Sequence, residues 1–83
     1  MGHRQRLSEP AVKARSASLE FVVEEPETTL VVDTARASAG DALERITVAP
    51  IDGTPRYRVV IALRRDAVSG VMTAVMNALD KDH

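Results

Sequence analysis

The stretch from Asp66 to Leu79 constrains the fold more than any other part of this sequence. Its apolar residues recur with the spacing of an α-helix, about 3.6 residues. They are Val68, Val71, Met72, Val75, Met76 and Leu79. Asp66 precedes them and can cap the helix, because its carboxylate can accept hydrogen bonds from the free backbone N–H groups of the first turn. The spacing therefore predicts a helix over 68–79.

The polar residues of this predicted helix fall on one narrow stripe, formed by Ser69, Thr73, Asn77 and Asp80. Nearly all of the remaining circumference is apolar. A helix that rests on one sheet needs an apolar arc of little more than about 100°. The surplus predicts that the helix also associates with a second surface. The alternative interpretation is that single apolar residues and alanines are ordinary on a protein surface.

Two strands are predicted before this helix, joined as a hairpin. Leu19–Glu24 alternates between apolar and polar residues, and Thr28–Asp33 is rich in β-branched residues, which favour strands. The segment 25–27 between them contains Pro26, which cannot donate to a strand ladder. We therefore expect a turn there.

A second hairpin is predicted from Ile46–Ile51 and Arg56–Leu63. The Asp52–Gly53 pair between them is typical of a type I′ turn, because both residues tolerate positive φ angles, and Thr54–Pro55 could lengthen the loop. The segment 39–44 between the two hairpins predicts a short helix or turn, although it could equally run extended.

The resulting fold class is α+β. We expect a small antiparallel sheet of about four strands, in two hairpins, with the C-terminal helix packed on one face. That face carries Phe21, Val59 and Ile61.

Composition predicts one small domain without disulfides. The chain has 83 residues, no cysteine and only two aromatic residues, Phe21 and Tyr57. Its core must therefore consist of aliphatic side chains, and the stability of so short a chain is expected to be marginal. Residues 1–17 have no periodic pattern of apolar residues, so we expect a flexible basic arm there. The single domain is expected over 18–80, followed by a tail over 81–83. The sequence contains no apolar run of membrane-spanning length or signal-peptide type, so we expect a cytoplasmic protein. Its arginine and alanine bias suggests a bacterial source.

Enzymatic chemistry is not indicated, and we expect no catalytic residue, cofactor or metal. His3 and His83 sit at the chain ends without cysteine or carboxylate partners at ligand spacing. The carboxylates at 24, 25 and 27 lack the defined spacing of a cation site. Ser38 has no internal histidine to serve as its base.

Arginines supply the one candidate anion or nucleic-acid surface, at Arg56, Arg58, Arg64 and Arg65. Phosphates bind such clusters, and the predicted arm would add Arg4, Arg6, Lys13 and Arg15. The alternative is that Arg56 and Arg58 pair with Glu20 and Glu24 of the neighbouring strand.

The function that the sequence favours is protein binding, in a regulatory or accessory module. The expected interface lies on the C-terminal helix, at Val71, Met72, Val75, Met76 and Leu79, helped by the second sheet face with Val22, Val60 and Ala62. Methionine suits an adaptable binding surface. The partner would be a second copy or a larger protein, with nucleic acid as the alternative and no membrane.

Overall fold

A computed structural model describes residues 16–82 of the chain. The elements in this range are β1 (Ser16–Glu24), α2 (Glu25–Ala39), the 3₁₀ helix η1 (Gly40–Ala42), β2 (Leu43–Pro50), β3 (Arg56–Arg64), the 3₁₀ helix η2 (Arg65–Ala67) and α3 (Val68–Asp82). Residues 1–15 of the predicted arm lie outside the described range, and so does His83 of the predicted tail.

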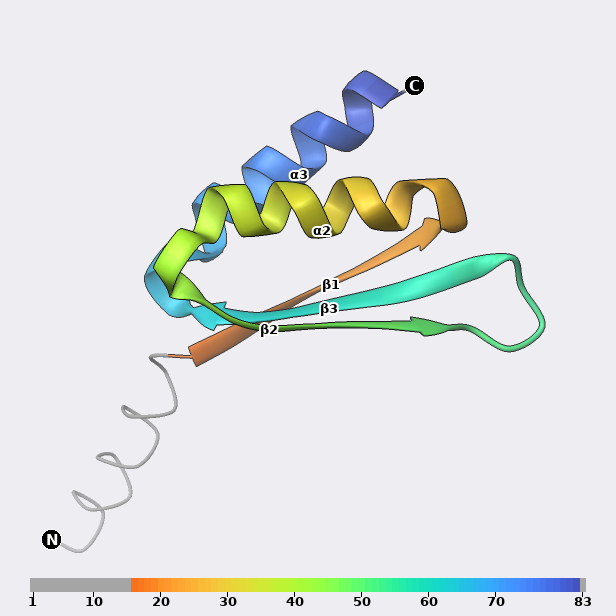
Figure 1. The fold of residues 1–83 in the computed structure, drawn as a ribbon, viewed down its shortest axis with the longest axis horizontal. Helices are drawn as coiled ribbons and strands as arrows, with labels where there is room; N and C mark the ends of the chain where they lie inside the picture. The colour runs from red at the N-terminus through yellow and green to blue at the C-terminus, as the bar shows by residue number, and fades with distance from the viewer. Residues whose placement is uncertain (1–15, 83) are drawn as a thin grey trace, which may run out of the picture.

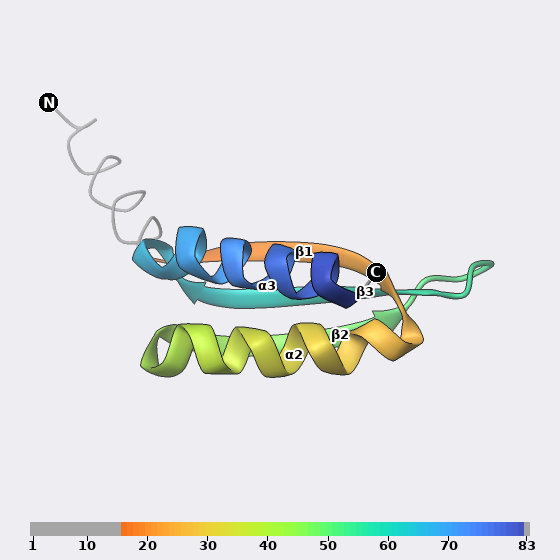
Figure 2. The ribbon, with the colours of Figure 1, turned by 90° about the horizontal axis from the view of Figure 1, so that it is seen from above.

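The described residues form an α+β fold with one antiparallel sheet of three strands in the order β1-β3-β2. Both outer strands pair antiparallel with β3, so β1 and β2 run in the same direction as a split β-α-β unit. Both long helices lie on the same side of the sheet (Figure 1), and the view from above shows them side by side (Figure 2). The opposite face of the sheet is therefore left without a covering layer by residues 16–82.

The first predicted hairpin is wrong, because residues 25–33 begin α2 rather than forming a turn and a strand. Pro26 stands in the first helical turn, where a missing N–H costs nothing. Glu24 and Glu27 complete a capping box, in which the Glu24 N–H donates to Glu27 Oε1 over 3.2 Å. Val31 and Ala35, four residues apart, are both fully buried. The β-branched residues of this segment thus follow tertiary packing, which overrides their strand propensity.

The short helix or turn expected over 39–44 is confirmed in part, since α2 ends at Ala39, the 3₁₀ helix η1 covers 40–42, and the chain runs extended from Leu43. Gly40 has a φ of 55°, and its N–H donates to the carbonyl oxygen of Arg36. The backbone then passes through η1 into β2 at Leu43. The hydroxyl of Ser38 donates to the carbonyl oxygen of Thr34 over 2.6 Å, within the last turns of α2.

The second predicted hairpin is confirmed, since β2 pairs with β3. Its connection is not a type I′ turn. Among the described residues only glycines have positive φ, and in this loop that residue is Gly53, at 79°. A type I′ turn needs positive φ at two successive residues. The loop is closed instead by the Ile51 N–H, which donates to the carbonyl oxygen of Arg56 over 3.0 Å.

The core lies between the helices and the covered face of the sheet. On β3 the residues Val59, Ile61 and Leu63 are fully buried, as expected from their alternation. The helices contribute Val31, Ala35, Val71 and Val75 to the same cluster. The prediction that the C-terminal helix covers the face with Phe21, Val59 and Ile61 is confirmed, with Phe21 half-buried at its margin. The helix layer is larger than expected, because α2 shares it.

Candidate interaction site

Helix α3 divides the five residues expected at an interface into two groups. Val71 and Val75 are 1% and 0% exposed and belong to the core of this chain. Leu79 is half-buried and packs against that core. Met72 and Met76 are 43% and 56% exposed. The two methionines are therefore the part of the predicted interface that the chain leaves accessible.

The polar stripe of α3 lies at the surface, since Ser69, Thr73, Asn77 and Asp80 are all exposed. Between this stripe and the buried residues runs an apolar flank of four residues, Val68, Met72, Met76 and Leu79. Val68 and Leu79 are its half-buried members. We call these four residues the methionine flank. Part of the surplus apolar arc seen in the sequence packs against α2, and the part that stays exposed is formed by Met72 and Met76.

The direction of the methionine flank follows from the hand of the helix. In Figure 1, α3 runs from left to right with the sheet below it and α2 in front of it, and Figure 2 agrees. Each residue of a right-handed helix is turned by about 100° from the one before. For a helix running in this direction, Met72 and Met76 are turned from the buried Val71 and Val75 to the side away from α2. This is the side on which β1 forms the edge of the sheet (Figure 2).

Strand β1 is regular along its whole length. It pairs with β3 from Ser16 opposite Arg64 to Glu24 opposite Arg56, without a register shift. Its covered side carries the buried Leu19 and Val23. Its other side carries Val22, 47% exposed, on the open face of the sheet. The neighbouring Val60 of β3 is half-buried on that open face. Strand β1 thus adjoins an apolar flank above and a partly apolar face below.

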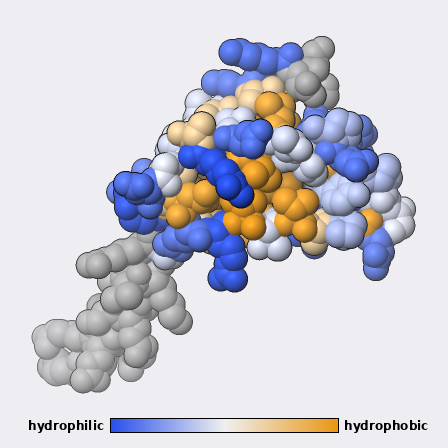
Figure 3. All heavy atoms as spheres, in the orientation of Figure 1, coloured by the Kyte–Doolittle hydropathy of each residue, from blue (hydrophilic) through white to orange (hydrophobic). Residues whose placement is uncertain are grey.

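A second apolar patch, which the sequence did not reveal, lies along β2. Its members are the half-buried Val32, Leu43 and Ile46 and the 43% exposed Val48. Figure 3 shows apolar side chains gathered in the middle of the view, where α2 and β2 lie in Figure 1. The alternation of Ile46 and Val48 was a sequence signal for one shared face. How much of that face is covered could not be predicted, because α2 was assigned as a strand.

The arginine surface is partly neutralised. Arg58 Nε donates to Glu20 Oε2 over 2.8 Å, and Arg64 Nε to Asp66 Oδ1 over 3.5 Å. The first of these is the cross-strand pair expected for Arg58. Arg56 lies opposite Glu24 in the register, and Arg65 is exposed in η2. Tyr57, the aromatic residue closest to this cluster in sequence, is half-buried and alternates onto the helix-covered face.

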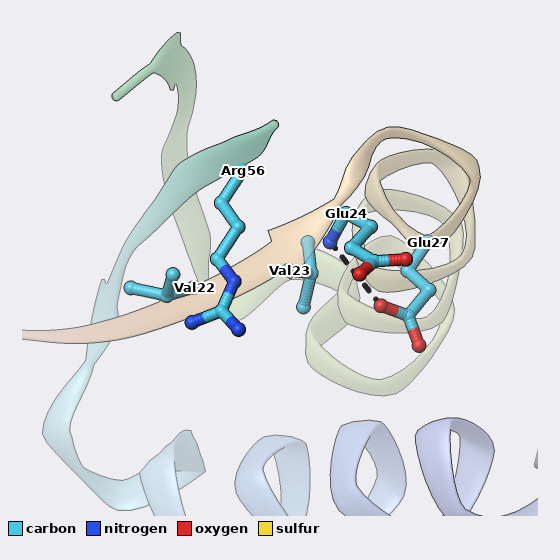
Figure 4. A pocket seen from close by; sticks show the side chains of 5 residues that line it. All are labelled: Val22, Val23, Glu24, Glu27 and Arg56. Carbon is cyan, nitrogen blue, oxygen red and sulfur yellow. Dashed lines mark hydrogen bonds between the residues drawn. The ribbon is translucent and has the colours of Figure 1, made fainter. Parts of the chain in front are cut away.

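An open hollow of about 290 Å³ lies where β1 leads into α2, lined by Val22, Val23, Glu24, Glu27 and Arg56. Figure 4 shows the Arg56 guanidinium beside Val22, whereas the two carboxylates lie on the α2 side. Glu24 and Glu27 already serve the capping box. In the described part of the chain, no group of three or more His, Cys, Asp or Glu side chains is placed to hold a metal ion. This hollow offers one arginine to an anion and no nucleophile with a base.

The candidate site is thus a set of surfaces on a two-layer α+β domain, namely the methionine flank, the β1 edge and the open sheet face. The chain matches no protein-family model, and no curated protein sequence is significantly similar to it. Within residues 16–82, no helix combines the length and apolar character needed to cross a membrane.

Proposed function

We propose that this protein is a non-enzymatic binding module that acts by self-association, as a regulatory or accessory component. The observation that carries this proposal is the methionine flank, where Met72 and Met76 are 43% and 56% exposed beside two half-buried aliphatic residues. Exposed apolar side chains that continue a buried cluster are typical of interfaces. Methionine adds an adaptable, polarisable surface.

The open sheet face supports the same proposal. Its centre carries Val22 and Val60, and its margin carries charged residues such as Glu20, Arg56 and Arg58. An apolar centre with a charged margin resembles the core and rim of a protein interface. A small domain that buries little surface of its own also gains stability by associating.

Nucleic-acid binding is the weaker alternative. It would use Arg56, Arg58, Arg64 and Arg65, but Arg58 and Arg64 already pair with carboxylates. Single-strand readers stack bases on exposed aromatic residues, and Tyr57 is half-buried. A labelled oligonucleotide that binds at low salt and dissociates as salt rises would favour this alternative.

The proposal is tested by placing a charge in the methionine flank. Met76→Asp is expected to weaken self-association by at least about tenfold, because a carboxylate would be desolvated in the contact. The circular dichroism spectrum should stay native, since Met76 is 56% exposed. The readout is solution mass by light scattering over a dilution series.

Thr73→Asp is the matched control, because Thr73 is exposed on the polar stripe of the same helix. It should leave the dissociation constant unchanged. An equal loss in both variants would place the contact elsewhere. A wild-type chain that stays monomeric up to about 1 mM would refute self-association.

A further inference from the structure

We propose that a second copy of this chain pairs with the free edge of β1, so that two sheets join antiparallel across a two-fold axis and their methionine flanks meet above the junction. This inference rests on the proposed self-association and specifies its geometry. The product would be a six-stranded sheet, with three strands from each copy.

The first argument is that the two edges of the sheet differ in their capacity to pair. The edge of β1 is free in the described residues, and its nine-residue strand has no register shift and no proline. Strand β2 is interrupted by an irregularity between Leu43 and Arg45 and ends at Pro50. Bulges and prolines are common devices that stop an edge from pairing. The regular edge is therefore the one that offers a full row of backbone donors and acceptors.

The second argument is that β1 is compatible with itself. In a two-fold antiparallel pair, residues on the same face must stand opposite one another. A pair centred on Phe21 would place Leu19 opposite Val23 of the other copy on the covered side. On the open side Glu20 would stand opposite Val22 and Ser18 opposite Glu24, so no two carboxylates face each other directly. The charge of Glu20 is already balanced by Arg58, 2.8 Å away.

The third argument is that the same operation uses the exposed methionines. The hand of α3 turns the methionine flank away from α2, and the element on that side of the sheet is β1. A second copy added at β1 brings its own α3 alongside on that side. Met72 and Met76 of both copies would then extend the helix layer across the junction. An assembly that joins two identical edges is also complete after two copies, because no β1 edge remains unpaired. The interrupted β2 strands then form the two outer edges of the joined sheet.

The decisive measurement is amide hydrogen exchange of the full chain, read residue by residue by NMR at high and low concentration. In a single copy, every second amide of an edge strand points away from its neighbour and exchanges quickly. We expect these β1 amides to be protected at high concentration and to lose protection on dilution. The corresponding β2 amides should exchange quickly at both concentrations.

The matched pair of variants is Val22→Glu on β1 and Thr47→Glu on β2. Both residues are exposed on the open sheet face. Val22 lies opposite Arg58 in its own sheet, so the new carboxylate is tolerated in the single copy. Across the junction, the new carboxylate of each copy would face Glu20 of the other copy, so the like-charge contact would occur twice in the dimer. We expect Val22→Glu to raise the dimer dissociation constant by about tenfold and Thr47→Glu to leave it unchanged.

The outcomes separate the two proposals. A dimer whose outward β1 amides exchange as fast as those of β2 would overturn the β1 pairing and leave self-association standing. Protection that appears in β2 instead would assign the contact to the other edge. A chain that stays monomeric at every concentration would remove self-association and the β1 pairing together.

Discussion

The two edges of the sheet are built differently. On β1 the covered side is closed, since Leu19 and Val23 are 8% and 6% exposed, and the strand is regular. On β2 the side chains that face the helices are less buried, since Val48 is 43% exposed, and the ladder is interrupted by a register shift. Apolar cover and backbone regularity therefore vary together in this sheet, and β1 has more of both. The exposure of an apolar side chain alone does not show which edge pairs with another strand.

Each edge of the sheet has a different helix above it. The element α2 contributes Val31 and Ala35 to the core, and it lies over the β2 side of the sheet, while α3 lies over the β1 side (Figure 2). The register shift between Leu43 and Arg45, directly after the 3₁₀ turn, interrupts the ladder at the start of β2. The edge with the poorer cover is thus also the edge with the poorer backbone geometry.

The largest expected effect compares two side chains in one row of the sheet. Leu19 of β1 and Ile46 of β2 both stand opposite Ile61 of β3. Leu19→Ala should lower the free energy of unfolding by about 2–5 kcal/mol, as is usual for a buried leucine. Ile46→Ala should cost less, because Ile46 is only half-buried and its side chain already keeps contact with water.

Urea denaturation of both variants measures this difference. Val60→Ala is the control, since Val60 lies in the central strand on the open face and is half-buried. Equal losses for Leu19 and Ile46 would contradict the unequal cover of the two edges.

A smaller effect is expected at the start of α2. Glu27→Ala removes the carboxylate that accepts from the Glu24 N–H over 3.2 Å. Loss of a capping interaction costs about 1 kcal/mol, so thermal unfolding should shift down by a few degrees. Glu25→Ala is the control, because Glu25 lies in the same acidic first turn and is exposed. If both substitutions have the same effect, the helix dipole rather than the capping box is responsible.

The capping box also shows where prediction from the sequence reached its limit. Strands β1 and β3, the second hairpin and α3 were predicted because alternation and helical spacing are strong there. Residues 25–33 combine β-branched side chains with a proline, which favours a turn and a strand locally. The helix forms because Pro26 fits the first turn, Glu24 and Glu27 cap it, and Val31 and Ala35 share one buried face. That last contribution depends on the position of β3, which local sequence does not contain.

The candidate site was predicted in part for the same reason. Helical spacing identified the apolar arc of α3, but the boundary between Val75 in the core and Met76 at the surface depends on where the sheet lies. The two residues are adjacent, yet they are 0% and 56% exposed. The patch around Val48 was missed altogether, because its extent depends on α2.

The smallest expected effect concerns the cross-strand ion pair between Glu20 of β1 and Arg58 of β3. Glu20 and Arg58 lie 2.8 Å apart with side chains that are 53% and 50% exposed. Ion pairs this exposed contribute about 0.2–1 kcal/mol to the free energy of unfolding, and salt screens them. A double-mutant cycle with Glu20→Gln and Arg58→Gln should give a coupling energy in this range in the single copy, falling toward zero at high salt.

The same cycle sharpens the comparison of the edges when it is repeated at concentrations where the chain associates. If β1 pairs with a second copy, Glu20 becomes covered by the partner strand, and the loss of its counter-charge should weaken association more than it weakens the single copy. If the coupling energy is the same in both states, Glu20 stays as exposed in the assembly as in the monomer. That result would argue that β1 is not the edge through which the chains join.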